Sequence, residues 1–297
     1  MRRVLVLGLL VAAGAVATAA ARQQQGPKDV VVDQLKDNLY VLKGGGGNTA
    51  VFVASDGVTV VDTKVPGWGQ PILDAIKKVT DKPITRVINT HTHGDHVSGN
   101  VDFPASIDIV TQDNTKANMQ KMDVFTKSSG RGLPTRTFAD TMTIGSGPDE
   151  IDLYYFGPGH TNGDAWVVFK ALRTVHAGDL FASKGLPLVD TNNGGSVLHY
   201  AETLGTAYRG IHDVDTVING HSDKTSTWDD LKTYQEFNQD FLDWAQKELA
   251  SGKSPADAAA EWQLPAKYKA LGYSDRAPSM FGGLEGRLQL LATEMKQ

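Results

Sequence analysis

Short apolar runs, separated by glycine, proline and polar residues, recur along the chain from about residue 38 to residue 219. Runs of this length that are rich in β-branched and aromatic residues are typical of buried β-strands. The pattern therefore predicts strands over the following ranges: Asn38–Leu42, Ala50–Ala54, Val58–Asp62, Arg86–Asn89, Ile107–Thr111, Ile151–Phe156, Ala165–Phe169, Thr174–Ala177 and Thr216–Asn219.

Several stretches between these runs carry apolar residues at helical spacing. Ile72, Ile76 and Val79 are four and three residues apart and share one face of a helix. The spacing predicts helices over Gln70–Thr80 and, from weaker patterns, over Thr115–Phe125 and Leu198–Ile211. Since strands alternate with helices, we expect an α/β fold built in layers.

From Trp228 onward the pattern changes to nearly continuous helix. Trp228–Ala250 places its large apolar residues broadly on one side, Ser254-Pro255 is a good helix start, and Arg287–Lys296 forms a last amphipathic piece. We therefore divide the chain into a domain of residues 22–226 and a C-terminal helical extension of residues 227–297. The extension is expected to pack on that domain, and a small dimerisation element is the alternative.

The first residues have the pattern of a targeting segment. Arg2 and Arg3 precede an uncharged run from Val4 to Ala21, which ends in small residues. The run just reaches the length of a membrane anchor, but its alanine-rich end favours cleavage. We predict a signal peptide over residues 1–21, a periplasmic or secreted protein, and no stable membrane association after cleavage.

Composition excludes several classes of function. The chain of 297 residues contains 29 basic and 34 acidic residues, a net charge of −5, so it lacks the basic surplus of a nucleic-acid-binding protein. It has no cysteine, which excludes disulfides, thiol nucleophiles and thiolate metal sites. We expect a small-molecule substrate and no nucleic acid, whereas the oligomeric state is not predicted.

The chemistry is concentrated in the segment His91-Thr92-His93-Gly94-Asp95-His96, directly after a predicted strand. Imidazole nitrogens and carboxylate oxygens are the ligands that remain for a divalent metal when thiolate is absent. His91 and His93 are two residues apart on an extended segment, so they point to the same side. Asp95 and His96 fall on the next bend. Such a turn is suited to two metal ions side by side.

Later strands end in further candidates for the same site. His160 follows the strand predicted over Ile151–Phe156, Asp179 follows the next-but-one strand, and His221 follows the last. Each alone is typical of a cap or a surface residue. Together they place ligand-type side chains on the edge where α/β sheets build their sites. Three histidines stay outside this pattern and are interpreted as structural or incidental: His176, His199 and His212. For His199, a place in the pocket lining is the alternative.

From about Asn38 to His221 these residues resemble the metallo-β-lactamase superfamily, with a ligand set closer to glyoxalase II and lactonases than to cysteine-containing lactamases. The resemblance implies a four-layer αββα sandwich, followed here by the C-terminal helical extension. It also implies a dinuclear zinc site supported by Asp62. His91, His93 and His160 would bind one zinc, Asp95, His96 and His221 the other, and Asp179 would bridge them. Iron or manganese could replace the two Zn²⁺ ions.

This metal set implies a hydrolase in which a bridging hydroxide attacks the carbonyl of an ester, lactone, thioester or lactam. Asp95 would be catalytic as well as a ligand, because it would orient the hydroxide and pass a proton to the leaving group. Two alternatives remain open. One is a mononuclear iron oxidoreductase of the persulfide dioxygenase type, and the other is a non-catalytic metal-binding protein.

Two segments are candidates for shaping the substrate pocket. The run Gly44–Gly47 is flexible enough for a lid and equally typical of a plain hairpin loop. The segment Met119–Leu133 could supply an apolar pocket wall or be a surface helix with its core stripe.

Overall fold

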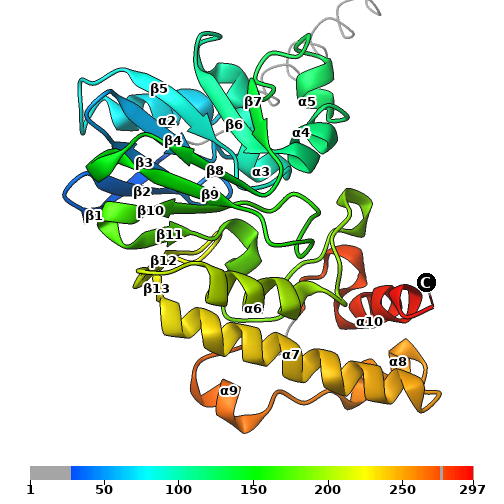
Figure 1. Cartoon of the computed structure of the whole chain (residues 1–297). Helices are drawn as coiled ribbons and strands as arrows, with labels where there is room; N and C mark the ends of the chain where they lie inside the picture. The colour runs from blue at the N-terminus through cyan, green and yellow to red at the C-terminus, as the bar shows by residue number, and fades with distance from the viewer. Residues whose placement is uncertain (1–27, 275–276, 297) are drawn as a thin grey trace, which may run out of the picture.

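Two β-sheets packed face to face form the centre of the molecule, and helices cover both outer surfaces (Figure 1). The computed structural model describes residues 28–274 and 277–296. The predicted signal peptide, residues 1–21, lies outside the described residues. Within the part that is described, no helix is both long enough and apolar enough to cross a membrane.

The first sheet contains seven strands in sequence order, β1 to β7. Its first four strands are antiparallel, whereas β4 to β7 run parallel, so the carboxyl ends of β4 and β5 meet at one edge. The strands are β1 (Val31–Lys36), β2 (Leu39–Lys43), β3 (Thr49–Val53), β4 (Val58–Val61), β5 (Ile84–Ile88), β6 (Asp108–Gln112) and β7 (Arg136–Phe138).

The second sheet contains six strands in the order β13-β12-β11-β10-β9-β8. Only β11 and β12 are parallel neighbours, so their carboxyl ends also share an edge. The strands are β8 (Thr141–Ile144), β9 (Ile151–Tyr154), β10 (Trp166–Phe169), β11 (Thr174–His176), β12 (Thr216–Ile218) and β13 (Ser226–Thr227).

Alternating side chains divide the interior into layers. Val61 and Phe52 belong to the core between the two sheets, together with Val167 of the second sheet. Their neighbour Val60 faces the other way, into the core beneath α2. This period of two is the side-chain geometry of a strand, and it lets one strand fill two cores. The predicted αββα sandwich is confirmed.

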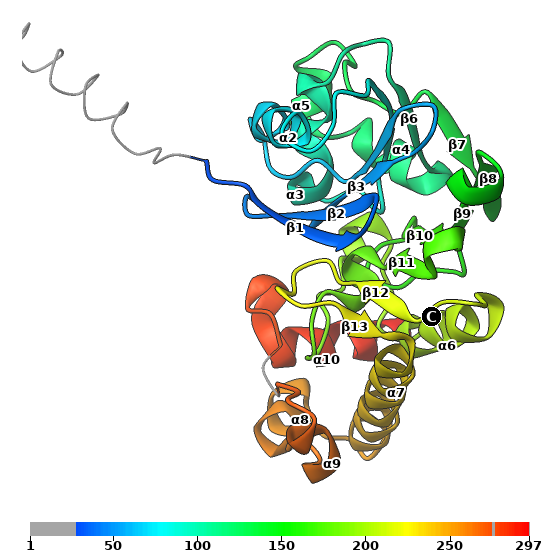
Figure 2. The same ribbon diagram turned by 90° about the vertical axis from the view of Figure 1, so that its left-hand side faces the viewer.

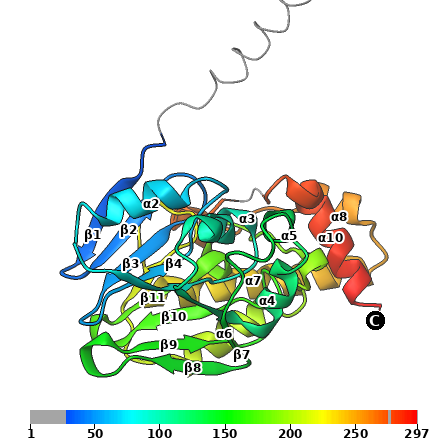
Figure 3. The ribbon, with the colours of Figure 1, turned by 90° about the horizontal axis from the view of Figure 1, so that it is seen from above.

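Helices form the two outer layers, as Figures 2 and 3 show from two further directions. Helices α2, α3 and α4 each follow a strand of the first sheet and α5 follows α4, whereas α6 and α7 cover the second sheet. The helices are α2 (Gly69–Ile76), α3 (Gly94–Val97), α4 (Asp113–Met119), α5 (Asp123–Thr126), α6 (Tyr200–Gly210), α7 (Trp228–Ala250), α8 (Pro255–Glu261), α9 (Ala266–Ala270) and α10 (Gly283–Glu294).

The C-terminal helices share one apolar core with the second sheet. Tyr234 and Phe237 of α7 and Leu288 of α10 are fully buried there beside Trp166 of β10. A capping box in which Thr227 and Asp230 satisfy each other's backbone groups fixes the start of α7. The helical extension is therefore present and buries one face, while its division from the domain at residues 226 and 227 stays a prediction.

The differences from the predicted elements concern exposed segments. β1, β7, β8 and the two-residue β13 were not predicted, because each has exposed positions that break the apolar run. The helix predicted over Thr115–Phe125 is wrong as one element, since the chain turns between α4 and α5. Other helices end within a few residues of their expected bounds, and α7 matches Trp228–Ala250.

Candidate metal centre

Four strand ends carry the residues that the sequence analysis selected. Asp62 follows β4 and His91 follows β5, while Asp179 and His221 follow β11 and β12. His160 lies in the loop between β9 and β10. Since the two parallel strand pairs end at the same edge of the sandwich, residues far apart in sequence meet there.

His91, His93, His160 and Asp179 form the first group of possible ligands, whose nearest polar atoms all lie within 4.8 Å of one another. The Nδ1 atom of His93 is 2.9 Å from Nε2 of His160. The His91 ring centre lies 4.6 Å from that of His160 and 4.9 Å from that of His93. Three imidazoles and a carboxylate thus face one point.

Asp95, His96 and His221 form a second group of the same kind. The Nε2 atoms of His96 and His221 are 3.3 Å apart, and Oδ2 of Asp95 lies 3.3 Å from Nε2 of His221. The short helix α3 carries both Asp95 and His96 in a single turn, which is why consecutive residues can serve the same group.

Asp179 lies between the two groups. Its Oδ2 atom is 3.6 Å from Nε2 of His160 in the first group and 3.3 Å from Nε2 of His221 in the second. Its Oδ1 atom is 3.4 Å from Nε2 of His96. The structure therefore brings all seven predicted ligands to one place, and the position of Asp179 suits the bridging role expected for it.

Three of these histidines are held here at the ring nitrogen that faces away from the centre, and His93 is described below. His91 Nδ1 lies 3.0 Å from Thr90 Oγ1, and His96 Nδ1 lies 2.7 Å from Asp62 Oδ2. His160 Nδ1 lies 2.9 Å from the Leu188 carbonyl oxygen. Support of this kind fixes the tautomer and the orientation of a metal-binding imidazole.

A test of whether a cation fits comes from the atoms that face inward. If the outer nitrogens donate their protons, Nδ1 of His93 and Nε2 of His160 present lone pairs to each other at 2.9 Å. Among the described residues, Nε2 of His91 and Oδ1 of Asp179 are buried without a hydrogen-bond partner. A shared cation would satisfy all of these acceptors together, so the residues fit a divalent metal.

The protonation states agree with this reading. Burial lowers the pKa of His91 well below its ordinary value and that of His160 to about 4, so both are neutral at neutral pH. Burial would raise the pKa of Asp179, but His96 and His221 outweigh burial and hold it well below the usual range. His91, His160 and Asp179 are therefore already in the form that binds a metal.

Asp62 lies behind the centre, as the resemblance implies. The residue is fully buried, and its carboxylate accepts hydrogen bonds from the Thr90 backbone N–H at 2.8 Å and the Thr90 hydroxyl at 2.7 Å, in addition to the contact with His96. Asp62 therefore fixes both the start of the ligand turn and one imidazole.

Sequence reasoning missed Asp190. Its Oδ2 atom lies 2.9 Å from Nε2 of His93, and the Asn193 side chain and the Asn192 N–H donate to the same carboxylate. The run Asp190-Thr191-Asn192-Asn193 is typical of a turn, and no spacing in the sequence connects it with His93.

Replacing Asp190 by Asn should weaken metal binding without unfolding the protein. The variant loses the charged acceptor of His93, and loss of such a support costs about 10- to 100-fold in metal affinity. Competition with a chromophoric chelator measures the change. Asp56→Asn, an exposed turn residue, is the matched control and should bind metal as the wild type does.

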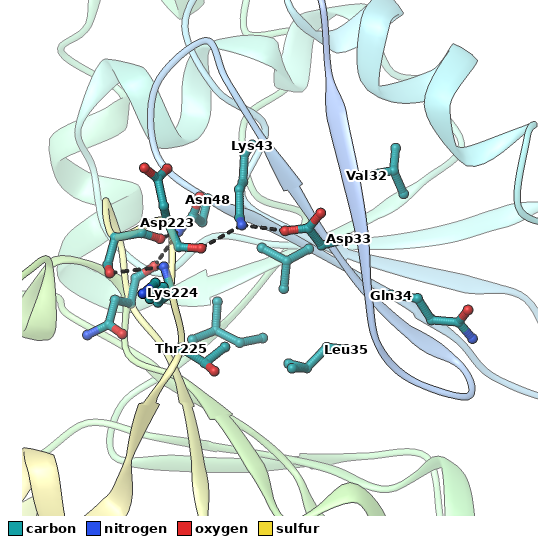
Figure 4. Close-up of a pocket in the computed structure, with 13 residues that line it drawn as sticks. Val32, Asp33, Gln34, Leu35, Lys43, Asn48, Asp223, Lys224 and Thr225 are labelled. Atoms are coloured by element: carbon teal, nitrogen blue, oxygen red, sulfur yellow. Dashed lines mark hydrogen bonds and ion pairs between the residues drawn. The ribbon is translucent and has the colours of Figure 1, made fainter.

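His221 is positioned by contacts between the two sheets. The Asn48 side chain donates to the carbonyl oxygens of Asn219 at 2.9 Å and Ser222 at 2.8 Å. Lys43 donates to the Asp223 carbonyl oxygen and pairs with Asp33 (Figure 4). These residues line a cavity of about 660 Å³ between the sheets, on the other side of the His221 loop. The cavity contains none of the predicted ligands.

The glycine run is packed against the centre, which argues against the lid. A Cβ atom on Gly47 would come 2.2 Å from the His96 ring, and one on Gly46 would come 2.6 Å from the Asp95 carbonyl oxygen. The buried Lys64 donates to the Gly47 carbonyl oxygen at 2.7 Å, and burial lowers the pKa of this lysine to about 7. Gly46 and Gly47 thus allow the backbone to pass close to the candidate ligands Asp95 and His96.

The other proposed pocket wall is also core. Met119 and Phe125 are buried in a small cluster with Val97, and Leu133 packs against it. His176, one of the three histidines outside the pattern, is buried and lies 3.0 Å from the Asn48 carbonyl oxygen through Nε2. Its contacts agree with the structural role predicted for it.

A cavity of about 530 Å³ opens on the two ligand groups. Asp95, His93, His160, Asp179 and His221 form its polar side. Its other walls come from the segment after Asp179 and from the C-terminal extension. The volume is in the range of pockets that bind small molecules.

Comparisons with known proteins agree with this geometry. The profile of the metallo-beta-lactamase superfamily matches residues 42–240. The chain is 26% identical to "Metallo-beta-lactamase type 2" of Elizabethkingia meningoseptica over 235 aligned residues. The aligned region covers 75% of this chain and 89% of that protein.

Solved structures share the fold. A metallo-beta-lactamase from Pontibacter korlensis has a TM-score of 0.60 and 18% identity, over 71% of this chain and 99% of that one. The inverting sec-alkylsulfatase Pisa1 from Pseudomonas sp. has a TM-score of 0.73 and 15% identity, over 89% of this chain. The matched part is 50% of the alkylsulfatase. Because the profile covers more than half of the sequence, the chain belongs to the metallo-β-lactamase superfamily and is a metal-dependent hydrolase of the β-lactamase-like kind.

Proposed function

We propose that the protein is an exported dinuclear zinc hydrolase that cleaves an ester, lactone, thioester or lactam. The observation that carries the proposal is the meeting of two ligand groups around Asp179, with a cavity of small-molecule size beside them. His91, His93 and His160 would hold one ion, Asp95, His96 and His221 the other, and Asp179 both. Export rests on the predicted signal peptide of residues 1–21.

Two zinc ions held in this way would supply a hydroxide nucleophile at neutral pH and a Lewis acid for the carbonyl group. The protein's own part is to fix the reacting groups and move the proton. Burial would raise the pKa of Asp95, but the hydrogen bond from His221 and the charge of His96 outweigh burial and lower it to about 2. Asp95 is therefore a carboxylate at neutral pH, and it lies on the cavity wall.

Asp95 is the residue that we assign to proton transfer. Its Oδ2 atom lies close to both His96 and His221, at 3.7 and 3.3 Å, and a third of the side chain stays accessible. A carboxylate in this place can accept a hydrogen bond from the attacking group and pass its proton to the leaving group. Asp95 would act as a catalytic residue and a ligand together.

The complete second group supports two metal ions rather than the single iron of a persulfide dioxygenase. A mononuclear centre needs only the first group, whereas Asp95, His96 and His221 also converge here. The cavity beside both groups likewise supports catalysis over metal storage.

Metal removal is the direct test. The purified protein should contain two equivalents of zinc by elemental analysis, and a chelator should abolish turnover on a panel of esters, lactones, thioesters and lactams. Added zinc should restore the rate. One equivalent of iron together with thiol-dependent oxygen uptake would instead support the oxygenase, and metal without turnover on any substrate would support the binding protein.

A further inference from the structure

The wall of the catalytic cavity opposite the ligands is apolar and comes from two distant parts of the chain. Leu186, Pro187 and Leu188 follow the short helix that carries Asp179. Pro278 and Met280 belong to the C-terminal extension, which also contributes Tyr234 of α7. We call the residues Leu186, Pro187, Leu188, Tyr234, Pro278 and Met280 the apolar wall.

Backbone contacts hold the two parts of the apolar wall together. Arg287 of α10 is buried and donates from Nη1 to the Pro187 carbonyl oxygen. The Ser274 N–H donates to the Lys184 carbonyl oxygen at 3.0 Å, and Gly185 and Ser274 form a β-bridge. The wall is therefore built into the fold and does not depend on a ligand to order it.

The apolar wall is also tied to the catalytic centre. The Leu188 carbonyl oxygen lies 2.9 Å from Nδ1 of His160, so the residue that lines the wall also orients a metal ligand. A group that rests on this wall is consequently held beside the bond that the centre cleaves. Such placement lets binding of an unreactive part of the substrate contribute to the rate of reaction.

Met280 lies at the mouth of the cavity and is 64% exposed, whereas Leu186 and Tyr234 are buried. An exposed thioether chain beside a cavity offers adaptable apolar surface that a ligand can cover. Each methylene group that moves from water onto apolar surface is worth about fourfold in binding. The wall thus favours substrates with an aliphatic chain.

The described residues that line the cavity include no lysine or arginine that could pair with a substrate anion. We propose that the apolar wall binds an aliphatic arm of an uncharged ester or lactone, and that Met280 is a residue that determines specificity for this arm. The inference rests on the proposed hydrolase function and names its substrate class. In the reaction, water adds across the ring C–O bond of a lactone: the carbonyl carbon gains the oxygen, the ring oxygen leaves with a proton, and a hydroxy acid results.

The test uses γ-lactones whose single alkyl arm grows from methyl to hexyl, with the zinc-loaded full chain. For the wild type, kcat/KM should rise two- to fourfold for each added methylene. Met280→Glu should lower kcat/KM about tenfold for the hexyl lactone and leave the methyl lactone within twofold. The matched control is Met295→Glu, which changes an exposed methionine at the other end of α10 that does not line this cavity.

A flat dependence on arm length in the wild type, or an equal dependence in Met280→Glu, would overturn the proposal. Loss of all chelator-sensitive turnover would count against the hydrolase function instead. In that case calorimetry with butanoate and octanoate still tests the wall. Tighter binding of octanoate in the wild type but not in Met280→Glu supports it, and equal affinities in the wild type reject it.

Discussion

Asp95→Asn should lower kcat by about 10²- to 10⁴-fold, which is the range that proton transfer by a positioned side chain contributes. The amide keeps the size of the carboxylate and can still face His221 through its oxygen, as Oδ2 of Asp95 does at 3.3 Å from Nε2. It cannot accept a proton. We expect KM to change little, since the uncharged substrate we propose makes no ionic contact with this side chain.

Rapid-mixing kinetics on the best substrate from the panel measures the effect, with zinc content determined on the same sample. A variant that holds two metal ions and turns over at the wild-type rate would remove Asp95 from the catalytic role. A variant that has lost one ion would show that Asp95 is a ligand, and its lower kcat would then be assigned to the loss of that ion.

Asp62→Ala should lower the free energy of unfolding of the metal-free protein by about 3–5 kcal/mol, the usual result of removing one partner from a buried ion pair. Burial would lower the pKa of His96, but Asp179 and Asp62 outweigh burial and hold it well above its ordinary value. At neutral pH His96 is therefore a buried cation that loses a partner. The N–H and hydroxyl groups of Thr90 lose their acceptor as well.

The matched control is Asp213→Ala. Both aspartates have a left-handed backbone, with φ of 64° at Asp62 and 58° at Asp213, so alanine is strained equally at both. Asp213 is exposed and lies 3.6 Å from Arg173. Urea unfolding should give a much smaller loss for this control. Similar losses in the two variants would assign the effect to the backbone and contradict a role for the Asp62 carboxylate.

The buried strands and the candidate ligands that follow them were predictable from sequence, because the same short segments contain both. Val87 and Ile88 are fully buried, and the chain then turns directly into His91. The apolar run fixes the strand, and the strand end fixes the place of the histidine. The confirmed αββα fold depends on the same runs, and the grouping of the seven ligands lies where those runs end.

The supporting residues were not predictable, since they act across long separations in sequence. Asp190 meets His93 only through the turn that Asn192 and Asn193 stabilise. The apolar wall joins residues near 187 to residues near 280 through Arg287. The spacing of apolar and polar residues along the chain does not predict such contacts. The glycine run was ambiguous for another reason. Its sequence indicates only that the backbone can adopt many conformations, whereas the structure shows that the missing side chain at Gly47 leaves room for the His96 ring.

The seven candidate ligands are divided between the two sheets, and this division sets the order in which the site can assemble. The segment from His91 to His96 leaves the ribosome early, whereas His221 emerges much later and belongs to the second sheet. A nascent chain that has completed only its first sheet holds half of a binding site. The proposed metal ions would therefore be held by the full set of residues only once both sheets have docked.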